Sequence, residues 1–119
     1  MKVEKIWLRK SLSDLEVATF NFKWKKFYVA AFFSQQAAEK ALKAVYIKKF
    51  GKLIKAHDLV LIGKKVGIPP NLLKKCMPLS RAYVVTRYPD VEEIYTSREV
   101  EDFIKTAEEV IKWAKKKLK

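Results

Sequence analysis

The chain has 119 residues, 50% of them hydrophobic, and a formal net charge of +13; this fits one compact domain over residues 1–119 and leaves no room for a second. No apolar run approaches the roughly 20 residues that span a bilayer, and residues 1–5 do not lead into a signal-peptide core, so we expect a cytoplasmic protein without a membrane partner. The single cysteine, Cys76, and the single histidine, His57, are too few for an internal disulfide or a structural zinc site, and we expect neither a metal nor a cofactor.

Apolar side chains near the N-terminus recur at steps of mostly three and four residues, which predicts a first amphipathic helix. The residues that define its apolar face are Ile6, Leu8, Leu12, Leu15, Ala18 and Phe22. Residues 21–26 then interrupt the pattern with three lysines around Trp24. We expect this segment to connect the first helix to an antiparallel second one.

Residues 27–50 carry the strongest pattern in the chain. A seam of mostly small residues follows one helical face, formed by Phe27, Ala31, Ser34, Ala38, Ala41 and Val45. Further apolar stripes flank this seam, so that a single polar line, Gln36, Lys40 and Lys43, is expected to face water. A helix that is apolar over most of its circumference must be covered on several sides, which predicts the central helix of a bundle.

Two glycines and an aspartate mark the next helix boundaries. Gly51 is expected to end the central helix, because glycine accepts the left-handed conformation found just past a helix C-terminus. Residues 52–56 form a basic loop. Asp58 is the expected N-cap of a short helix that ends at Gly67.

Proline divides the following stretch. Pro70 opens a further helix, where proline costs least, and Pro78 predicts a kink or a break within it. This helix should end near Arg87, because Pro89 cannot continue the hydrogen-bond ladder. Residues 90–95 are expected to form a loop.

The last helix begins with a capping box, in which Thr96 caps and Glu99 reaches back. Apolar residues at helical spacing continue from there to the lysine-rich tail. We find no β alternation and no repeat. The sequence therefore predicts an all-α fold, an antiparallel up-and-down bundle of about five helices.

The charge comes from 26 Lys plus Arg against 13 Asp plus Glu. Such a field attracts polyanions, which favours RNA, DNA, a nucleotide or an acidic protein as a partner. The alternative is a solvated surface in a heat-adapted organism, in which lysine and glutamate are both enriched. Lysine exceeds glutamate here, so heat adaptation explains the density of charge better than its sign.

His57 is the one side chain whose ordinary pKa lies near neutrality, which makes it the obvious proton shuttle. Catalysis would require a partner, and none is evident near it in the sequence. The alternative is packing at a helix start beside Asp58. Cys76 is interpreted as a core residue.

The segment Arg87-Tyr88-Pro89-Asp90 is the second candidate. An arginine at a helix end beside an aromatic ring can clamp a phosphate and stack a base. The alternative is an arginine that neutralises the helix C-terminus with Asp90 as its partner. The residues alone leave both interpretations open.

Three motifs together resemble the signatures of the HEPN domain, the higher eukaryote and prokaryote nucleotide-binding domain. They are the run from Phe33 to Ala44 with its glutamine pair and alanine-lysine pattern, then His57-Asp58-Leu59, then Arg87-Tyr88-Pro89-Asp90. The resemblance covers roughly residues 8–113. It implies a helical bundle that commonly forms a homodimer and that often acts with a minimal nucleotidyltransferase encoded nearby.

Ribonuclease toxins of this family carry an arginine followed a few residues later by a histidine. In this chain no histidine follows Arg81, Arg87 or Arg98, because His57 precedes them all. The resemblance therefore implies a member that is not a nuclease and that binds a nucleotide, RNA or a partner protein. The candidate contact residues are Gln36, Lys40, Lys43, His57, Arg87 and Tyr88.

Two alternatives to this binding module stay open. One is a protein-interaction subunit of a toxin-antitoxin-like pair, without a ligand of its own. The other is a metal-independent RNase in which folding brings His57 and Arg87 together as the catalytic residues.

Overall fold

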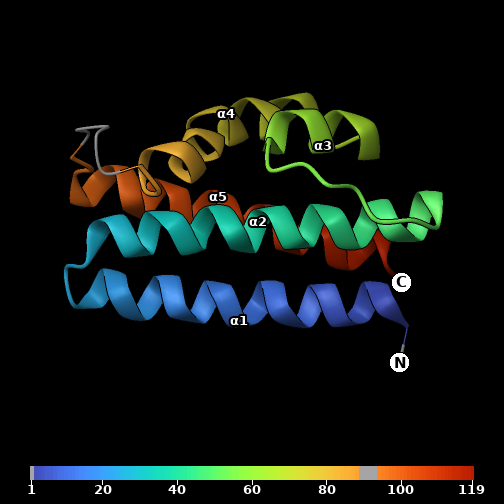
Figure 1. Cartoon of the computed structure of the whole chain (residues 1–119), viewed down its shortest axis with the longest axis horizontal. Helices are drawn as coiled ribbons and strands as arrows, with labels where there is room; N and C mark the ends of the chain where they lie inside the picture. The colour runs from blue at the N-terminus through green and yellow to red at the C-terminus, as the bar shows by residue number, and fades with distance from the viewer. Residues whose placement is uncertain (1, 89–93) are drawn as a thin grey trace.

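The computed structural model describes residues 2–88 and 94–119, and within these ranges the chain forms five helices and no strand (Figure 1). They are α1 (Val3–Lys23), α2 (Phe27–Phe50), α3 (Leu59–Val66), α4 (Pro70–Val85) and α5 (Ser97–Lys117). The four long helices run alternately up and down in chain order, and the short α3 lies beside α4. The predicted all-α bundle is confirmed. Of the predicted loop at residues 90–95, residues 90–93 lie outside the described ranges, as does Pro89.

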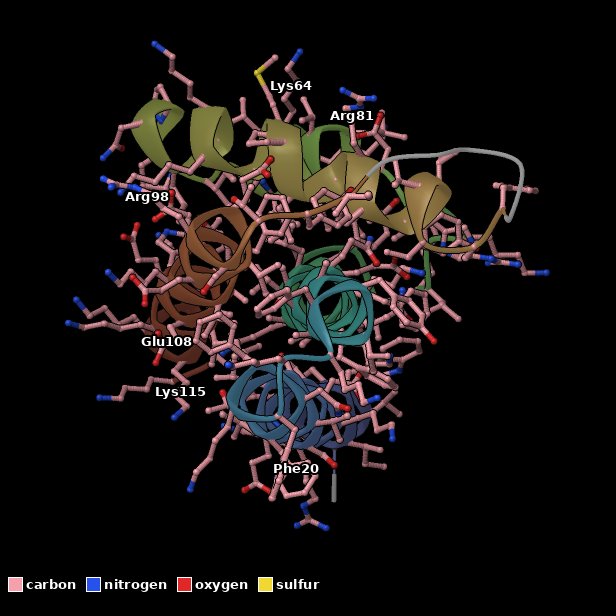
Figure 2. All side chains as sticks on the ribbon, turned by 90° about the vertical axis from the view of Figure 1, so that its left-hand side faces the viewer. Phe20, Lys64, Arg81, Arg98, Glu108 and Lys115 are labelled. Carbon is pink, nitrogen blue, oxygen red and sulfur yellow. The ribbon has the colours of Figure 1, made fainter. Side chains whose placement is uncertain are left out.

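α2 lies at the centre of the bundle and contacts each of the other described helices. Figure 2 shows it end-on, with α1, α4 and α5 around it. The predicted seam is buried from Ala31 to Val45, and its alanines have no exposed surface. Small side chains allow neighbouring backbones to approach closely, so the alanine-rich helix accepts partners on several sides. The central position predicted for residues 27–50 is confirmed.

The buried face of α1 is centred differently from the prediction. Ser11, Asp14 and Ala18 are its buried residues, whereas Ile6 is 51% exposed. The Ser11 hydroxyl donates a hydrogen bond to the carbonyl oxygen of Ala37 at 2.6 Å. A large side chain at the centre of this face would hold α1 away from the small-residue surface of α2. The leucines predicted to form the face lie half-buried on its flanks.

Local capping residues behave as the sequence predicts. The Asp58 carboxylate accepts hydrogen bonds from the backbone N–H groups of Val60 and Leu61. Gly51 and Gly67 end α2 and α3 with φ values of +71° and +79°. The capping box at the start of α5 is present in both directions.

The predicted end of the first helix is wrong. α1 continues through Lys23 rather than ending near residue 21, so the connection to α2 begins only at Trp24. Of the kink or break predicted at Pro78, the break does not occur, because α4 continues through this residue. The proline ring lies on the exposed side of that helix, where water can satisfy the carbonyl that loses its N–H partner.

Cys76 is fully buried in the core, as predicted. Burial raises the pKa of its thiol from an ordinary 9.0 to about 11, and the nearby Glu109 carboxylate acts in the same direction. The thiolate is therefore suppressed, and Cys76 behaves as a small apolar residue.

Two kinds of feature do not occur in residues 2–88 and 94–119. None of these helices combines the length and apolarity that crossing a membrane requires. Nor do three or more His, Cys, Asp or Glu side chains gather there as metal ligands would.

Candidate functional site

His57 lies in the segment that leads into α3 and faces the middle of α2. Its Nδ1 atom is 3.2 and 3.3 Å from the two carboxylate oxygens of Glu39. Glu39 is buried, whereas the imidazole is 52% exposed. A neutral imidazole that donates through Nδ1 carries its lone pair on Nε2. Folding therefore brings to His57 a carboxylate partner that is not evident near it in the sequence.

Two further neighbours, Lys43 and Gln35, hold Glu39 in place. The Lys43 ammonium lies 3.0 Å from Glu39 Oε2 and balances its charge. Gln35 Nε2 donates to Glu39 Oε1 at 3.0 Å and to the carbonyl oxygen of His57 at 3.1 Å. Gln35, Glu39 and Lys43 recur at four-residue spacing, so they share one face of α2. Both the side chain and the backbone of His57 are thereby fixed to this helix.

A chain of hydrogen bonds continues from Gln35 to α1, and we call it the polar relay (Asp14, Lys40, Gln36, Gln35, Glu39 and His57). Gln36 Nε2 donates to Gln35 Oε1 at 2.7 Å, and Lys40 donates to Gln36 Oε1 at 3.1 Å. Lys40 also forms an ion pair of 2.6 Å with Asp14, which is buried. Complete pairing of this kind is what buried polar groups require.

The predicted polar line of α2 is therefore largely internal. Lys43 is only 5% exposed, contrary to the expectation that it faces water. Gln36 and Lys40 are half-buried and already bonded within the polar relay. The cause is the number of neighbours around α2, because a polar line on a helix enclosed by others must find partners inside the protein.

Tyr83 on α4 contacts both His57 and Arg87, the two candidate residues that lie far apart in the sequence. The His57 ring stacks on the Tyr83 ring with centroids 4.2 Å apart and planes 12° from parallel. The Arg87 guanidinium carbon lies 4.6 Å from the centroid of the same ring, and Arg87 donates a hydrogen bond to the Tyr83 hydroxyl. Sequence reasoning assigned no functional role to Tyr83. Its four-residue spacing from Arg87 was the available signal.

Two surface grooves adjoin this cluster. The His57 groove has a volume of about 680 Å³ and is lined by His57, Asp58, Val60, Met77, Pro78, Ser80, Arg81, Tyr83 and Val84. The Arg87 groove, of about 270 Å³, is lined by Tyr28, Val29, Phe32, Phe33, Thr86 and Arg87. The larger groove lies within the range of small-molecule sites, roughly 300–1,000 Å³.

Tyr88 follows α4 and is 52% exposed, but it lines neither groove. Pro89 and Asp90, which complete the predicted phosphate-binding segment, lie outside the described residues. The structure thus joins His57 and Arg87 through Tyr83. It places Gln36, Lys40 and Lys43 in internal pairs.

Comparison with known proteins gives matches along nearly the whole chain. The HEPN domain family model matches residues 4–118. A protein of Methanocaldococcus jannaschii named "Putative toxin MJ1304" is 30% identical over an alignment of 139 residues, which covers 100% of this chain and 90% of that protein.

Two crystal structures have the same fold. TT1696 from Thermus thermophilus superposes with a TM-score of 0.89 at 26% identity, covering 98% of this chain and 99% of that one. ST0689, described as an archaeal HEPN homologue, gives a TM-score of 0.84 at 29% identity and covers both chains completely. The family match and the shared fold agree with the three sequence motifs, and the chain belongs to the HEPN domain family.

Proposed function

We propose that this chain is a nucleotide- or RNA-binding module of a toxin-antitoxin-like pair, and that its ligand binds in the His57 groove. The observation that carries this proposal is the meeting of an exposed imidazole and an exposed guanidinium on Tyr83, at the edge of a groove large enough for a nucleotide. Both groups prefer anionic or planar ligands.

The chemistry of the His57 groove, and of Arg87 on Tyr83 at its edge, supports the same ligand. The Arg87 guanidinium offers paired N–H donors for a phosphate. The side chains of Val60, Met77 and Val84 give the groove apolar contact area for a base. The hydroxyl of Ser80, which lines the groove, supplies a polar group for orientation.

The role in a pair rests on the relative from Methanocaldococcus jannaschii that is named as a toxin. We propose a minimal nucleotidyltransferase as the partner, as the family resemblance implies, and a homodimer as the working form. Apolar side chains exposed outside both grooves support association, since Leu53 and Leu61 are 48% and 43% exposed.

Titration at low salt with ATP and with a short oligoribonucleotide tests ligand binding. Arg87→Ala should weaken binding by at least about tenfold, because a charged hydrogen bond contributes roughly 1.5–3 kcal/mol. Arg98→Ala is the matched control, because it removes an exposed arginine at the start of α5 that lines neither groove. Absence of binding to both ligands would reject the proposal and favour the protein-interaction subunit.

The pairing of Glu39 with His57 favours a second candidate, a metal-independent RNase. Glu39 orients the ring so that Nε2 of His57 can take the proton of a ribose 2′-hydroxyl. That oxygen would attack the adjacent phosphate to form a 2′,3′-cyclic phosphate, and the 5′-oxygen would leave with a proton taken from water, while the His57 imidazolium returns its proton to solvent. Arg87 would stabilise the phosphate charge. RNA cleavage by the wild-type protein that persists undiminished in His57→Ala would exclude this mechanism.

A further inference from the structure

Three large aromatic side chains are exposed where α1 passes into α2. Phe20, Trp24 and Tyr28, which we call the aromatic tip, are 63%, 65% and 64% exposed. The rings of Phe20 and Trp24 lie 6.4 Å apart between centroids, inclined by 52°. Figure 2 shows Phe20 pointing away from the bundle on the outer side of α1. Because these three side chains are largely exposed, they contribute little to the hydrophobic core.

The charged residues within the segment 20–28 are all lysines. Lys23, Lys25 and Lys26 are exposed between the rings of the aromatic tip. The sequence contains no acidic residue between Glu16 and Glu39. Within the described part of the chain, no carboxylate pairs with any of these three ammonium groups. Their charge is therefore available to a polyanion.

The aromatic tip continues into the proposed binding site. Tyr28 lines the Arg87 groove together with Phe32 and Phe33. Arg87, which also lines that groove, contacts Tyr83, and Tyr83 lines the His57 groove. Figure 1 shows the α1–α2 connection and the C-terminal end of α4 at the same end of the bundle.

We propose that the aromatic tip and the Arg87 groove form a track for single-stranded RNA that leads into the His57 groove. Bases stack on the exposed rings, and the lysines between them contact the phosphates. Unpaired bases present the faces that stacking needs, whereas duplexes hide them. The continuity with Arg87 favours an extended strand over a membrane, which would contact only the end of the hairpin. This inference rests on the proposed function and specifies its ligand.

The test measures the affinity of the full-length protein for uridine monophosphate, a dinucleotide, and oligouridines of about four and about eight residues. Affinity should rise with length until the track is filled. Trp24→Ala should weaken binding of the longest oligomer by about tenfold, as loss of one stacked base does. Tyr28→Ala should act in the same direction and provides a second variant. Quenching of tryptophan fluorescence by the oligomer, present in the wild type and lost in Trp24→Ala, gives an independent signal.

Phe50→Ala is the matched control. Phe50 is also an exposed aromatic, 45% accessible, beside Lys48 and Lys49, but it lies at the opposite end of α2. The Phe50→Ala substitution should leave the affinity for the longest oligomer unchanged.

The possible failures are distinguishable. If the wild-type protein binds neither mononucleotide nor oligomer, the proposed function fails, and the track fails with it. If the wild type binds the mononucleotide but its affinity does not rise with length, or if Trp24→Ala matches Phe50→Ala, the track alone is overturned. Anionic phospholipid vesicles that bind through Trp24 in preference to the oligomer would also overturn it.

Discussion

His57 Nδ1 lies 3.2 Å from Glu39 Oε2, so an exposed imidazole is paired with a carboxylate buried in the central helix. The same carboxylate accepts the Lys43 ammonium at 3.0 Å. Glu39 therefore has two roles: it balances the charge of the buried Lys43 ammonium and it orients the His57 ring. Substitutions can separate these two roles.

Glu39→Gln keeps the shape of the side chain but removes its charge, leaving Lys43 buried without its anion. We expect a loss of about 3 kcal/mol in the free energy of unfolding, as is typical when one partner of a buried pair is removed. Urea denaturation measures it. Glu109→Gln is the control, because its pair with Lys75 is about half exposed on both sides and should contribute no more than roughly 1 kcal/mol. Equal stability of Glu39→Gln and the wild type would contradict the assigned role.

The packing of α1 on α2 predicts a large loss of stability on substitution of Ser11 and almost none on substitution of Ser13. Ser11→Leu should destabilise the protein by about 2–3 kcal/mol, because the larger side chain separates the helices and the hydrogen bond to Ala37 is lost. Ser13→Leu, on the exposed face of the same helix turn, should change stability by no more than about 0.5 kcal/mol. Thermal unfolding followed by circular dichroism distinguishes the two, and comparable losses would argue against the small-residue contact.

Tyr83 should matter to binding through its ring more than through its hydroxyl. Tyr83→Leu removes the surface on which His57 and Arg87 meet, and we expect nucleotide affinity to fall by about tenfold. Tyr83→Phe keeps the ring and loses only the acceptor for Arg87, so its effect should be smaller. Isothermal titration calorimetry gives both affinities. A Phe variant as weak as the Leu variant would assign the effect to the hydroxyl instead.

Cys76 predicts a loss of stability in alkali. Its pKa rises from 9.0 to about 11 in the folded protein, so between these values the unfolded chain loses a proton that the folded chain keeps. Stability contributed by the protonated thiol is complete below pH 9 and falls by at most about 1.4 kcal/mol per pH unit above it. Cys76→Ala should lack this part of the slope when the free energy of unfolding is measured against pH. Identical slopes in the two proteins would contradict the raised pKa.

Helix ends were predictable because their causes are local. Asp58 and Thr96 cap through atoms within three residues of themselves, and Gly51 needs only its own freedom at positive φ. The central position of α2 followed from its apolar circumference. The buried face of α1 was not predictable from its own sequence, because Ser11 and Asp14 are buried through their contacts with residues on α2.

The candidate site was predictable only where a residue's role depends on its own side chain. Residue type singled out His57 and Arg87, since imidazole and guanidinium chemistry is intrinsic to the side chain. Glu39 and Tyr83 were missed because their roles arise only when the segment before α3 and the helix α4 pack onto α2. Lys43 was wrongly expected to face solvent. Its ammonium group is instead paired with the buried carboxylate of Glu39.

The polar relay has a mechanical consequence. Gln35 and Gln36 each use their amide oxygen and nitrogen for different neighbours, so neither amide can turn over without breaking bonds on both of its sides. The rotameric state of each side chain is thereby locked to that of the next. The orientation of the His57 imidazole is accordingly coupled to Asp14 on α1 through four intervening side chains.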